Sequence, residues 1–293
     1  MEIGLNLPVT NPAVTPAFLA EIARTAEALG FAELYLGEHV VLFDQPQDDY
    51  PSSDSGEAFF PANSPLPDPL VTHAFIAACT KKIRLATGVL LLPQRNPVYT
   101  AKHVATLDWL SGGRFDFTIG LGWSQEEFAA CDVPWTARGA RGDEYVAVMR
   151  SLWADDISSF EGRFYTLPAC RQYPKPVQRP HPPLWFGGWS DGAMARVARL
   201  GDGWYGFDLP AGQVAERVRH LRALLGEAGR SAGLVKILCG GYGILPRSLD
   251  ELRAYRDAGV EQFVFSLTEY EPAKMREQLK SYADIFVAGA ARW

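Results

Sequence analysis

Several features that would place the chain in a special class are missing from its 293 residues. Only four cysteines are present, none with CxxC spacing, so we expect reduced thiols in a cytoplasmic protein. No apolar run approaches the ~20 residues that span a bilayer, and the acidic opening Met1-Glu2 is unlike a signal peptide. The net charge of −6, without a basic stretch, argues against nucleic acid as a partner. We therefore expect neither a membrane nor a nucleic acid among its partners.

Motifs of common catalytic machinery are missing as well. The sequence has no HExxH or HxH, so we expect no metal site. It has no GxSxG, and no cysteine in a glycine-flanked turn, which argues against a serine or cysteine triad. The first predicted strand runs into Asn6-Leu7-Pro8 instead of GxGxxG, which argues against a doubly wound open sheet, the second architecture considered.

What is present is a repeating unit: an amphipathic helix, a glycine that ends it, and an apolar strand. Gly30 precedes the strand ELYLGEH, and Gly259 precedes EQFVFSL. Glycine suits the end of a helix because it adopts a positive φ without steric cost. Strands that are apolar on both faces are typical of parallel strands covered by helices.

About eight such strands are found, the number of a (β/α)8 barrel. The sequence therefore predicts the α/β class and a single TIM-like barrel domain over residues 1–293. The predicted strands are Glu2–Pro8, Glu33–His39, Arg84–Leu92, Arg114–Gly122, Pro183–Gly188, Gly203–Asp208, Leu234–Ile244 and Gln262–Thr268.

The starts of several helices between these strands are marked by capping residues. Asp68-Pro69 and Asn96-Pro97 each combine a capping side chain with a proline that suits the first helical position. Ser248 and Glu251 have the spacing of a capping box.

Two long segments interrupt the pattern, one after the second strand and one before the fifth. Residues 44–67 are rich in Pro, Ser and Asp, and residues 156–183 in proline and aromatics. We expect both to be loops without secondary structure at the barrel mouth, because long loops in compact domains are usually lids or binding loops. Tyr50, Phe59 and Phe60 suggest an aromatic lining, although loop aromatics also close cores.

Catalytic groups of such barrels lie at the carboxyl ends of the strands. His39 ends the second predicted strand, where it could exchange a proton near neutral pH or simply bind a backbone carbonyl. Glu38 is a candidate partner, but neighbours on a strand point to opposite faces, so it could instead hold nearby backbone or a cofactor edge. The other histidines lie within helices or between prolines.

Glycines interrupt three more strand ends. Gly88 lies inside an apolar strand, which marks a bulge, a close backbone approach or a packing glycine. Gly120 and Gly122 would let a flat ligand approach the main chain. Gly187–Ser190 (GGWS) lies between a strand and a helix, an arrangement that binds phosphate with backbone N–H groups, although Asp191 counts against it.

These residues together resemble the luciferase-like monooxygenase superfamily, and within it the F420-dependent oxidoreductases. The resemblance rests on MEIGLNLP, AEALGFAELYLGEHV, the stretch from DPLVTHAF to DFTIGLGW, and YPKPVQRPHPPLWFGGWSDGAMARVARLGDGW, which cover most of residues 1–205. The C-terminal third matches only in its general barrel pattern.

The resemblance implies a deazaflavin or flavin across the barrel mouth, with His39 beside the reactive ring and Glu38 in support. Members often carry a cis peptide at the position of Gly88-Val89. The cofactor-binding residues that the resemblance implies are His39, Thr87, Gly88, Val89, Gly120, Leu121, Gly122, Trp123, Gly187, Gly188, Trp189 and Ser190.

The family branch favours F420 over FMN. F420 has carbon at position 5, so its reduced form gives a hydride and reacts poorly with oxygen, and its chain continues beyond the phosphate into lactate and glutamates. Four basic residues before the fifth strand could meet this anionic tail or simply aid solubility: Arg163, Arg171, Lys175 and Arg179.

We therefore expect an F420-dependent oxidoreductase that transfers a hydride to or from a small organic substrate, with His39 moving the proton. The alternatives are an FMN-dependent monooxygenase that uses reduced FMN and oxygen, and a non-catalytic F420 carrier. Homodimers are common among relatives, so we expect a homodimer, to which the helix with Val98, Val104 and Leu107 could contribute.

Overall fold

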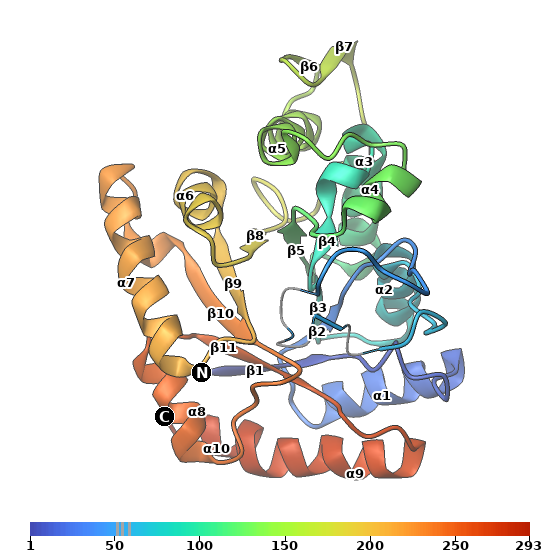
Figure 1. Cartoon of the computed structure of the whole chain (residues 1–293), viewed down its shortest axis with the longest axis vertical. Coiled ribbons are helices and arrows are strands. Elements are labelled where there is room, and N and C mark those ends of the chain that lie inside the picture. The colour runs from blue at the N-terminus through green and yellow to red at the C-terminus, as the bar shows by residue number, and fades with distance from the viewer. Residues whose placement is uncertain (51–52, 54–55, 58–59) are drawn as a thin grey trace.

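The computed structural model of the protein describes residues 1–50, 53, 56–57 and 60–293, and its centre is a closed barrel of parallel strands (Figure 1). The strands follow the order β3-β2-β1-β11-β10-β9-β8-β5, and β5 pairs with β3 to close the ring. With the short β4 counted as the continuation of β3, the eight predicted strands and the barrel are confirmed. The barrel strands are β1 (Glu2–Asn6), β2 (Glu33–Leu36), β3 (Arg84–Thr87), β4 (Leu90–Leu91), β5 (Phe115–Gly120), β8 (Leu184–Gly187), β9 (Gly203–Phe207), β10 (Lys236–Gly240) and β11 (Gln262–Ser266).

Helices surround the barrel and connect its strands. In the part of the chain that the structure describes, none of them is long and apolar enough to cross a membrane. They are α1 (Pro16–Ala28), α2 (Pro69–Cys79), α3 (Pro97–Ser111), α4 (Gln125–Ala130), α5 (Arg138–Ala154), α6 (Asp191–Leu200), α7 (Ala211–Glu227), α8 (Leu249–Asp257), α9 (Pro272–Tyr282) and α10 (Ala288–Ala290), with 3-10 turns at Leu92–Gln94 and Ala232–Leu234 and a π-helical turn at Ala283–Val287.

The predicted helix caps are present. The Asp68 carboxylate accepts hydrogen bonds from the first turn of α2, and the Asn96 side chain does the same for α3. Ser248 caps α8, while the Glu251 carboxylate accepts from Arg247 N, one residue before the cap.

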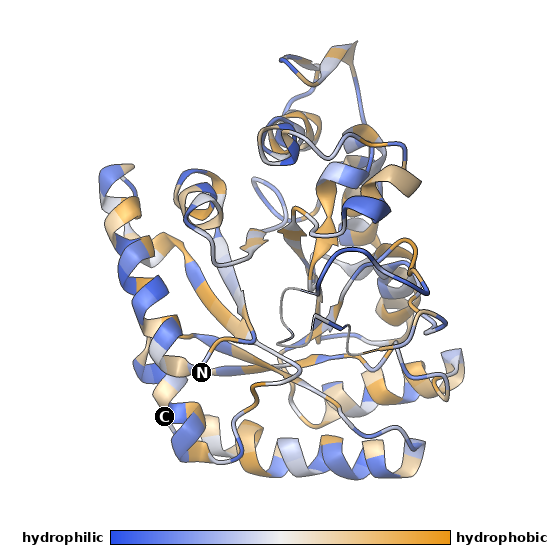
Figure 2. Ribbon diagram, in the orientation of Figure 1, coloured by the Kyte–Doolittle hydropathy of each residue, from blue (hydrophilic) through white to orange (hydrophobic). Residues whose placement is uncertain are grey.

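Two hydrophobic layers hold the barrel together. The larger lies between the strands and the surrounding helices, and Figure 2 shows hydrophobic residues on strands such as β5 and hydrophilic residues along α7. A smaller cluster fills the barrel interior, where the Tyr35 and Tyr205 rings stack with centroids 5.6 Å apart. Val89 and Phe207 pack against this inner cluster at the carboxyl ends of the strands, so they form the floor of the barrel mouth.

The third predicted strand is broken where Gly88 was expected to mark a bulge. Ala86 lies opposite Asp116 and Leu90 opposite Ile119, so four steps along β3–β4 match three along β5. This extra residue is the bulge, and the Gly88-Val89 peptide bond within it is cis, as the family resemblance implies.

The expectation of a structureless loop over residues 156–183 is wrong. The segment contains an antiparallel hairpin, β6 (Ser158–Glu161) and β7 (Thr166–Cys170), which Figure 1 shows beyond α5, outside the ring of strands. The Glu144 carboxylate of α5 accepts three backbone N–H groups from the hairpin's turn, from Arg163, Phe164 and Tyr165. The hairpin therefore packs on the outer side of a barrel helix.

Candidate active site

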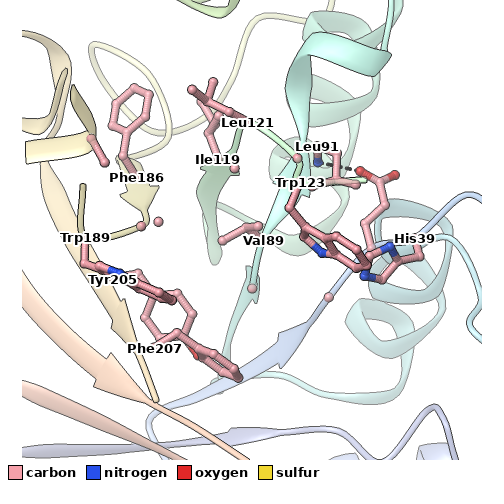
Figure 3. Close-up of a pocket in the computed structure, with 18 of the residues that line it drawn as sticks. His39, Val89, Leu91, Ile119, Leu121, Trp123, Phe186, Trp189, Tyr205 and Phe207 are labelled. Atoms are coloured by element: carbon pink, nitrogen blue, oxygen red, sulfur yellow. Dashed lines mark hydrogen bonds between the residues drawn. The ribbon is translucent and has the colours of Figure 1, made fainter. Parts of the chain in front are cut away.

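A cavity of about 590 Å³ lies at the carboxyl ends of the barrel strands. Figure 3 shows Val89 in its middle, His39 and Trp123 on one side, and Trp189 and Tyr205 on the other. Of the residues expected from the sequence, these line the cavity: Glu38, His39, Gly88, Val89, Gly120, Leu121, Gly122, Trp123, Gly187, Gly188, Trp189 and Ser190.

His39 lies three residues beyond the end of β2 and is held by a partner that the sequence did not indicate. Its Nδ1 is 3.1 Å from Oε2 of Glu127, on α4. The other carboxylate oxygen, Oε1, accepts a hydrogen bond of 2.5 Å from Val40 N. A carboxylate has no hydrogen to donate, so this contact places the ring hydrogen on Nδ1 and leaves Nε2 for the cavity.

Glu38 holds backbone instead of His39. Its carboxylate accepts hydrogen bonds from Leu91 N at 2.6 Å and from Arg95 Nε at 2.8 Å. Burial raises the pKa of Glu38, although the Arg95 guanidinium favours the charged form. Glu38 therefore does not support His39 as expected. Its hydrogen bonds instead connect the segment after β2 to β4 and to Arg95.

Two of the predicted glycines make room for Val89. A Cβ atom on Gly187 would lie 2.8 Å from Val89 Cγ1, and one on Gly120 would overlap Cγ2 of the same side chain. Both distances are shorter than real Cβ contacts, so these positions accommodate Val89 in addition to any ligand. The result is a smooth apolar surface at the centre of the cavity.

The turn Gly187–Ser190 joins the end of β8 to the start of α6, as the sequence predicts. Gly188 has φ +104°, and its carbonyl accepts a hydrogen bond of 2.7 Å from Trp204 Nε1, which fixes the turn. Ser190 caps α6, and Gly192 and Ala193 of the first turn of that helix line the cavity. The Asp191 carboxylate points away and pairs with Arg217 at 3.3 Å, so it does not repel an anion there.

Two arginines at this end of the cavity were missed by the sequence analysis. Arg138 is the first residue of α5, and Arg196 lies in the second turn of α6. The segment TARGARGDEYV combines glycine and arginine at a helix start, a pattern that could have suggested an anion site.

Aromatic rings from the 44–67 segment form a wall beside His39 and Trp123. The Tyr50 ring packs edge-on against Trp123 at 5.3 Å, and Phe60 lies 6.0 Å from His39, measured between ring centroids. Tyr50 and Phe60 thus line the cavity as expected, whereas Phe59 lies outside the described residues.

Other predicted residues lie elsewhere. Thr87 does not line the cavity, because its hydroxyl is bonded to both the N–H and the carbonyl of Thr118 on β5. The four basic residues proposed for an anionic tail are outside it as well. Among them, Arg171 pairs with Asp156, and Lys175 Nζ donates to the Leu152 carbonyl at 2.7 Å.

The cavity therefore has three parts: a glycine turn with a helix start and arginines, an apolar centre, and a histidine within an aromatic wall. This arrangement has room for a flat ring over Val89 and for a phosphate at the glycine turn, two groups that both F420 and FMN contain. The buried Glu127 carboxylate holds the His39 ring at the edge of this cavity.

Comparison with known proteins agrees with this fit. The family described as luciferase-like monooxygenase matches residues 1–291. An uncharacterised protein of Mycobacterium tuberculosis is 31% identical over 294 residues, 99% of each chain. The FMNH(2)-dependent dimethylsulfone monooxygenase of Pseudomonas putida is 36% identical over 138 residues, 46% of this chain and 37% of that protein. The F420-dependent tetrahydromethanopterin reductase of Methanopyrus kandleri shares the fold, with TM-score 0.79 and 15% identity, covering 98% of this chain and 99% of that one.

Proposed function

The chain belongs to the luciferase-like monooxygenase family, and from that membership and its pocket we propose that it is an oxidoreductase that transfers a hydride between coenzyme F420 and a small organic substrate. The observation that carries the proposal is one cavity joining an oriented histidine to an anion-binding end across an apolar floor. The family includes enzymes that use flavins and enzymes that use deazaflavins.

The residues divide the binding work between them. The turn Gly187–Ser190 would hold the phosphate, and Val89 would support the central ring from behind. When bound, F420 would give up or accept a hydride at its carbon C5. The protein contributes alignment, because the rigid floor and the fixed phosphate turn set the position of one reactant against the other.

On the substrate side, His39 would donate or accept the proton that accompanies the hydride. Glu127 keeps Nδ1 engaged, so Nε2 is the atom that would carry this proton. The surrounding wall of Trp123, Tyr50 and Phe60 excludes water and favours an uncharged, flat substrate.

The cofactor assignment is tested by titrating the purified protein with F420 and, separately, with FMN. We expect F420 to bind at least about tenfold more tightly, a difference of about 1.4 kcal/mol. Tight binding of FMN with no binding of F420 would overturn the assignment. A screen of F420H2 oxidation with enones, imines and quinones then identifies the substrate class.

The catalytic role is tested by replacing His39 with alanine. We expect the variant to bind F420 as the natural protein does and to lose turnover, by about 100-fold or more for a missing general acid or base. Unchanged turnover would remove His39 from the reaction, and absence of turnover with every substrate in the natural protein would favour a carrier.

A second candidate function is an FMN-dependent monooxygenase. It is favoured by the Pseudomonas putida relative, whose name gives it FMNH2 as cofactor. Oxygen consumption in the presence of reduced FMN and a candidate substrate distinguishes it, since hydride transfer from F420 consumes no oxygen.

We also propose that the protein forms a homodimer through α2 and α3. Of the expected contributors Val98, Val104 and Leu107, the last two are buried in the barrel's own core and Val98 is half-buried against that core. The outer faces of the two helices nonetheless expose large apolar side chains: Val71, Phe75, Tyr99, Trp109 and Leu110. Surfaces of this kind usually mark an interface between subunits.

Replacement of Trp109 by glutamate should convert the dimer into a monomer in sedimentation velocity, because a charge would be buried at the interface. The matched control is Ile285→Glu, at an exposed apolar residue of the π-helical turn. A natural protein that sediments as a monomer would end this proposal.

A further inference from the structure

Two helix starts meet at the anion-binding end of the cavity. The helix α6 begins beside the phosphate turn, and α5 begins at Arg138. They touch through Gly139 and Arg196: a Cβ atom on Gly139 would lie 2.9 Å from Arg196 Nη2. Arg138, Gly139 and Arg196 line the same cavity as the turn Gly187–Ser190, so the cavity holds two arginines in addition to that turn.

The Arg138 side chain is fixed in place by a ring contact and a single hydrogen bond, which use few of its N–H donors. Its guanidinium lies over the Trp135 ring, 3.6 Å from the centroid, and Trp135 in turn packs against the buried Phe128. Its Nε donates to the Gly122 carbonyl at 3.3 Å. Among the described residues it pairs with no carboxylate, which leaves the Nη end of the planar group free to bind an anion in bidentate fashion.

Arg196 is oriented by an ion pair through its Nε atom. Among the described residues, no carboxylate pairs with its Nη atoms. Asp143 accepts from Arg196 Nε at 2.5 Å and from Arg199 Nη2 at 2.8 Å. Arg196 and Arg199 share this one carboxylate, and Arg138 pairs with none among the described residues, so this group of four side chains carries more positive than negative charge. The whole chain carries a net charge of −6, which makes this local positive charge unusual for the molecule.

We propose that Arg138, with Arg196 beside it, forms a second anion-binding subsite. This subsite binds a carboxylate of the cofactor tail beyond the phosphate. The proposal rests on the proposed function and deepens it. In F420 the phosphate is a diester with a single charge, and the further charges are carboxylates farther along the chain. In FMN the phosphate is a monoester, and all of its charge is on the phosphate itself. A second subsite past the turn therefore distinguishes the two cofactors.

The test measures dissociation constants of four ligands by fluorescence titration or calorimetry. The ligands are F420, the deazaflavin 5′-phosphate that lacks lactate and glutamates, FMN and riboflavin. The variants are Arg138→Gln, Arg138→Lys and the matched control Arg199→Gln, which removes the same charge from an exposed arginine bound to the same Asp143.

We expect Arg138→Gln to weaken F420 binding about tenfold, the size of one charge-assisted hydrogen bond, and to change binding of the tail-less phosphate less than twofold. Arg138→Lys should recover only part of the loss, and Arg199→Gln should leave F420 binding within about twofold. The salt dependence of F420 binding should also become less steep in Arg138→Gln.

Each other outcome overturns the proposal. If Arg138→Gln weakens F420, the tail-less phosphate and FMN equally, Arg138 binds the phosphate and there is no second subsite. If F420 binding does not change, Arg138 binds no part of the cofactor. In both cases the natural protein still binds F420, so the proposed function stands, whereas binding of FMN without binding of F420 overturns both.

Discussion

At the scale of single residues, the arrangement that matters most is the pair formed by His39 and Glu127. A neutral imidazole carries its hydrogen on either nitrogen, and only one of these tautomers leaves Nε2 free to accept a proton. The Glu127 carboxylate is almost fully buried and also receives Val40 N–H, so it is fixed from two directions. The helix α4 thereby sets the orientation of a ring that belongs to another element.

Replacing Glu127 should therefore alter His39 without removing it. We expect Glu127→Ala to lower turnover by about 10- to 100-fold while the dissociation constant of F420 stays within about twofold, because the carboxylate positions the ring and does not bind the cofactor. Long-range ¹H–¹⁵N spectra of the histidine rings should show a mixture of tautomers in place of Nδ1–H. Glu127→Gln, which can still accept a hydrogen bond, should recover part of the turnover.

The neighbouring glutamate provides the control for this experiment. Glu126 lies on the same helix and accepts Gln47 N–H at 2.7 Å, so Glu126→Gln removes an equal charge without touching His39. Loss of turnover in Glu126→Gln to the same extent as in Glu127→Ala would show that α4 acts through the loop and not through the histidine.

The sequence indicates His39 but not its partner, and the reason is geometric. A strand end fixes where His39 lies, because all parallel strands end at one edge of the barrel. Glu127 and Arg138 lie on helices whose orientation is set only by packing. The spacing of Ser124 and Glu127 is that of a capping box, and Ser124 does accept Glu127 N–H, yet the carboxylate goes to His39. A local sequence pattern does not show that the Glu127 carboxylate binds a residue of another element.

At the scale of elements, the break between β3 and β4 decides the shape of the pocket. The bulge at Gly88-Val89 brings the Val89 side chain to the centre of the mouth, between β5 and β8. Those two strands can approach it only because they end in Gly120 and Gly187. The glycines of three strand ends therefore form one packing unit.

Gly187→Ala tests this packing unit. The added methyl group would lie 2.8 Å from Val89 Cγ1, so we expect the free energy of unfolding to fall by about 1–3 kcal/mol, the usual cost of overpacking. Val89→Ala in the same chain should relieve the clash and restore part of the loss, as measured by urea unfolding of the single and double variants.

Gly192→Ala is the matched control, because a methyl group there would meet only Ser190 Oγ at 4.0 Å. It should leave stability unchanged or slightly raised, since alanine favours the helix. If Gly187→Ala is as stable as the natural protein, or if Val89→Ala does not relieve it, the glycine is required by something other than Val89.

The elements themselves were largely predictable from the sequence, with one informative failure. The strands are continuous apolar runs and the helix starts carry capping residues, so both leave local patterns. Residues 156–183 have many prolines and aromatics, which indicate a loop. The first half of the segment nevertheless folds as a hairpin, to whose turn α5 supplies the Glu144 carboxylate. Glu144 lies outside the hairpin segment, so the sequence of that segment does not predict this contact.

At the scale of the whole molecule, the two ends of the barrel differ. The carboxyl end holds the pocket, and the opposite end holds a buried polar layer. There Glu33 accepts hydrogen bonds from Tyr35 Oη at 2.7 Å and from Gln262 Nε2 at 2.8 Å. Asp116 lies beside it and pairs with Arg84. Burial, with the nearby Asp116 charge, raises the pKa of Glu33 well above its usual range, so Glu33 keeps its proton in the folded chain.

The contribution of Glu33 to stability therefore falls with rising pH. Above the ordinary carboxyl pKa of 4.5, the unfolded chain loses the proton that folded Glu33 retains. Unfolding then releases a proton, so the free energy of unfolding decreases with pH until the folded group also ionises, by about 1.4 kcal/mol per pH unit. Glu33→Gln cannot titrate and keeps the hydrogen bonds, so its advantage over the natural protein should grow from pH 4.5 upward in urea unfolding. Glu2→Gln, at an exposed residue of the neighbouring strand β1, is the control for lost charge. Curves for Glu33→Gln that run parallel to those of the natural protein would mean that Glu33 is ionised when folded.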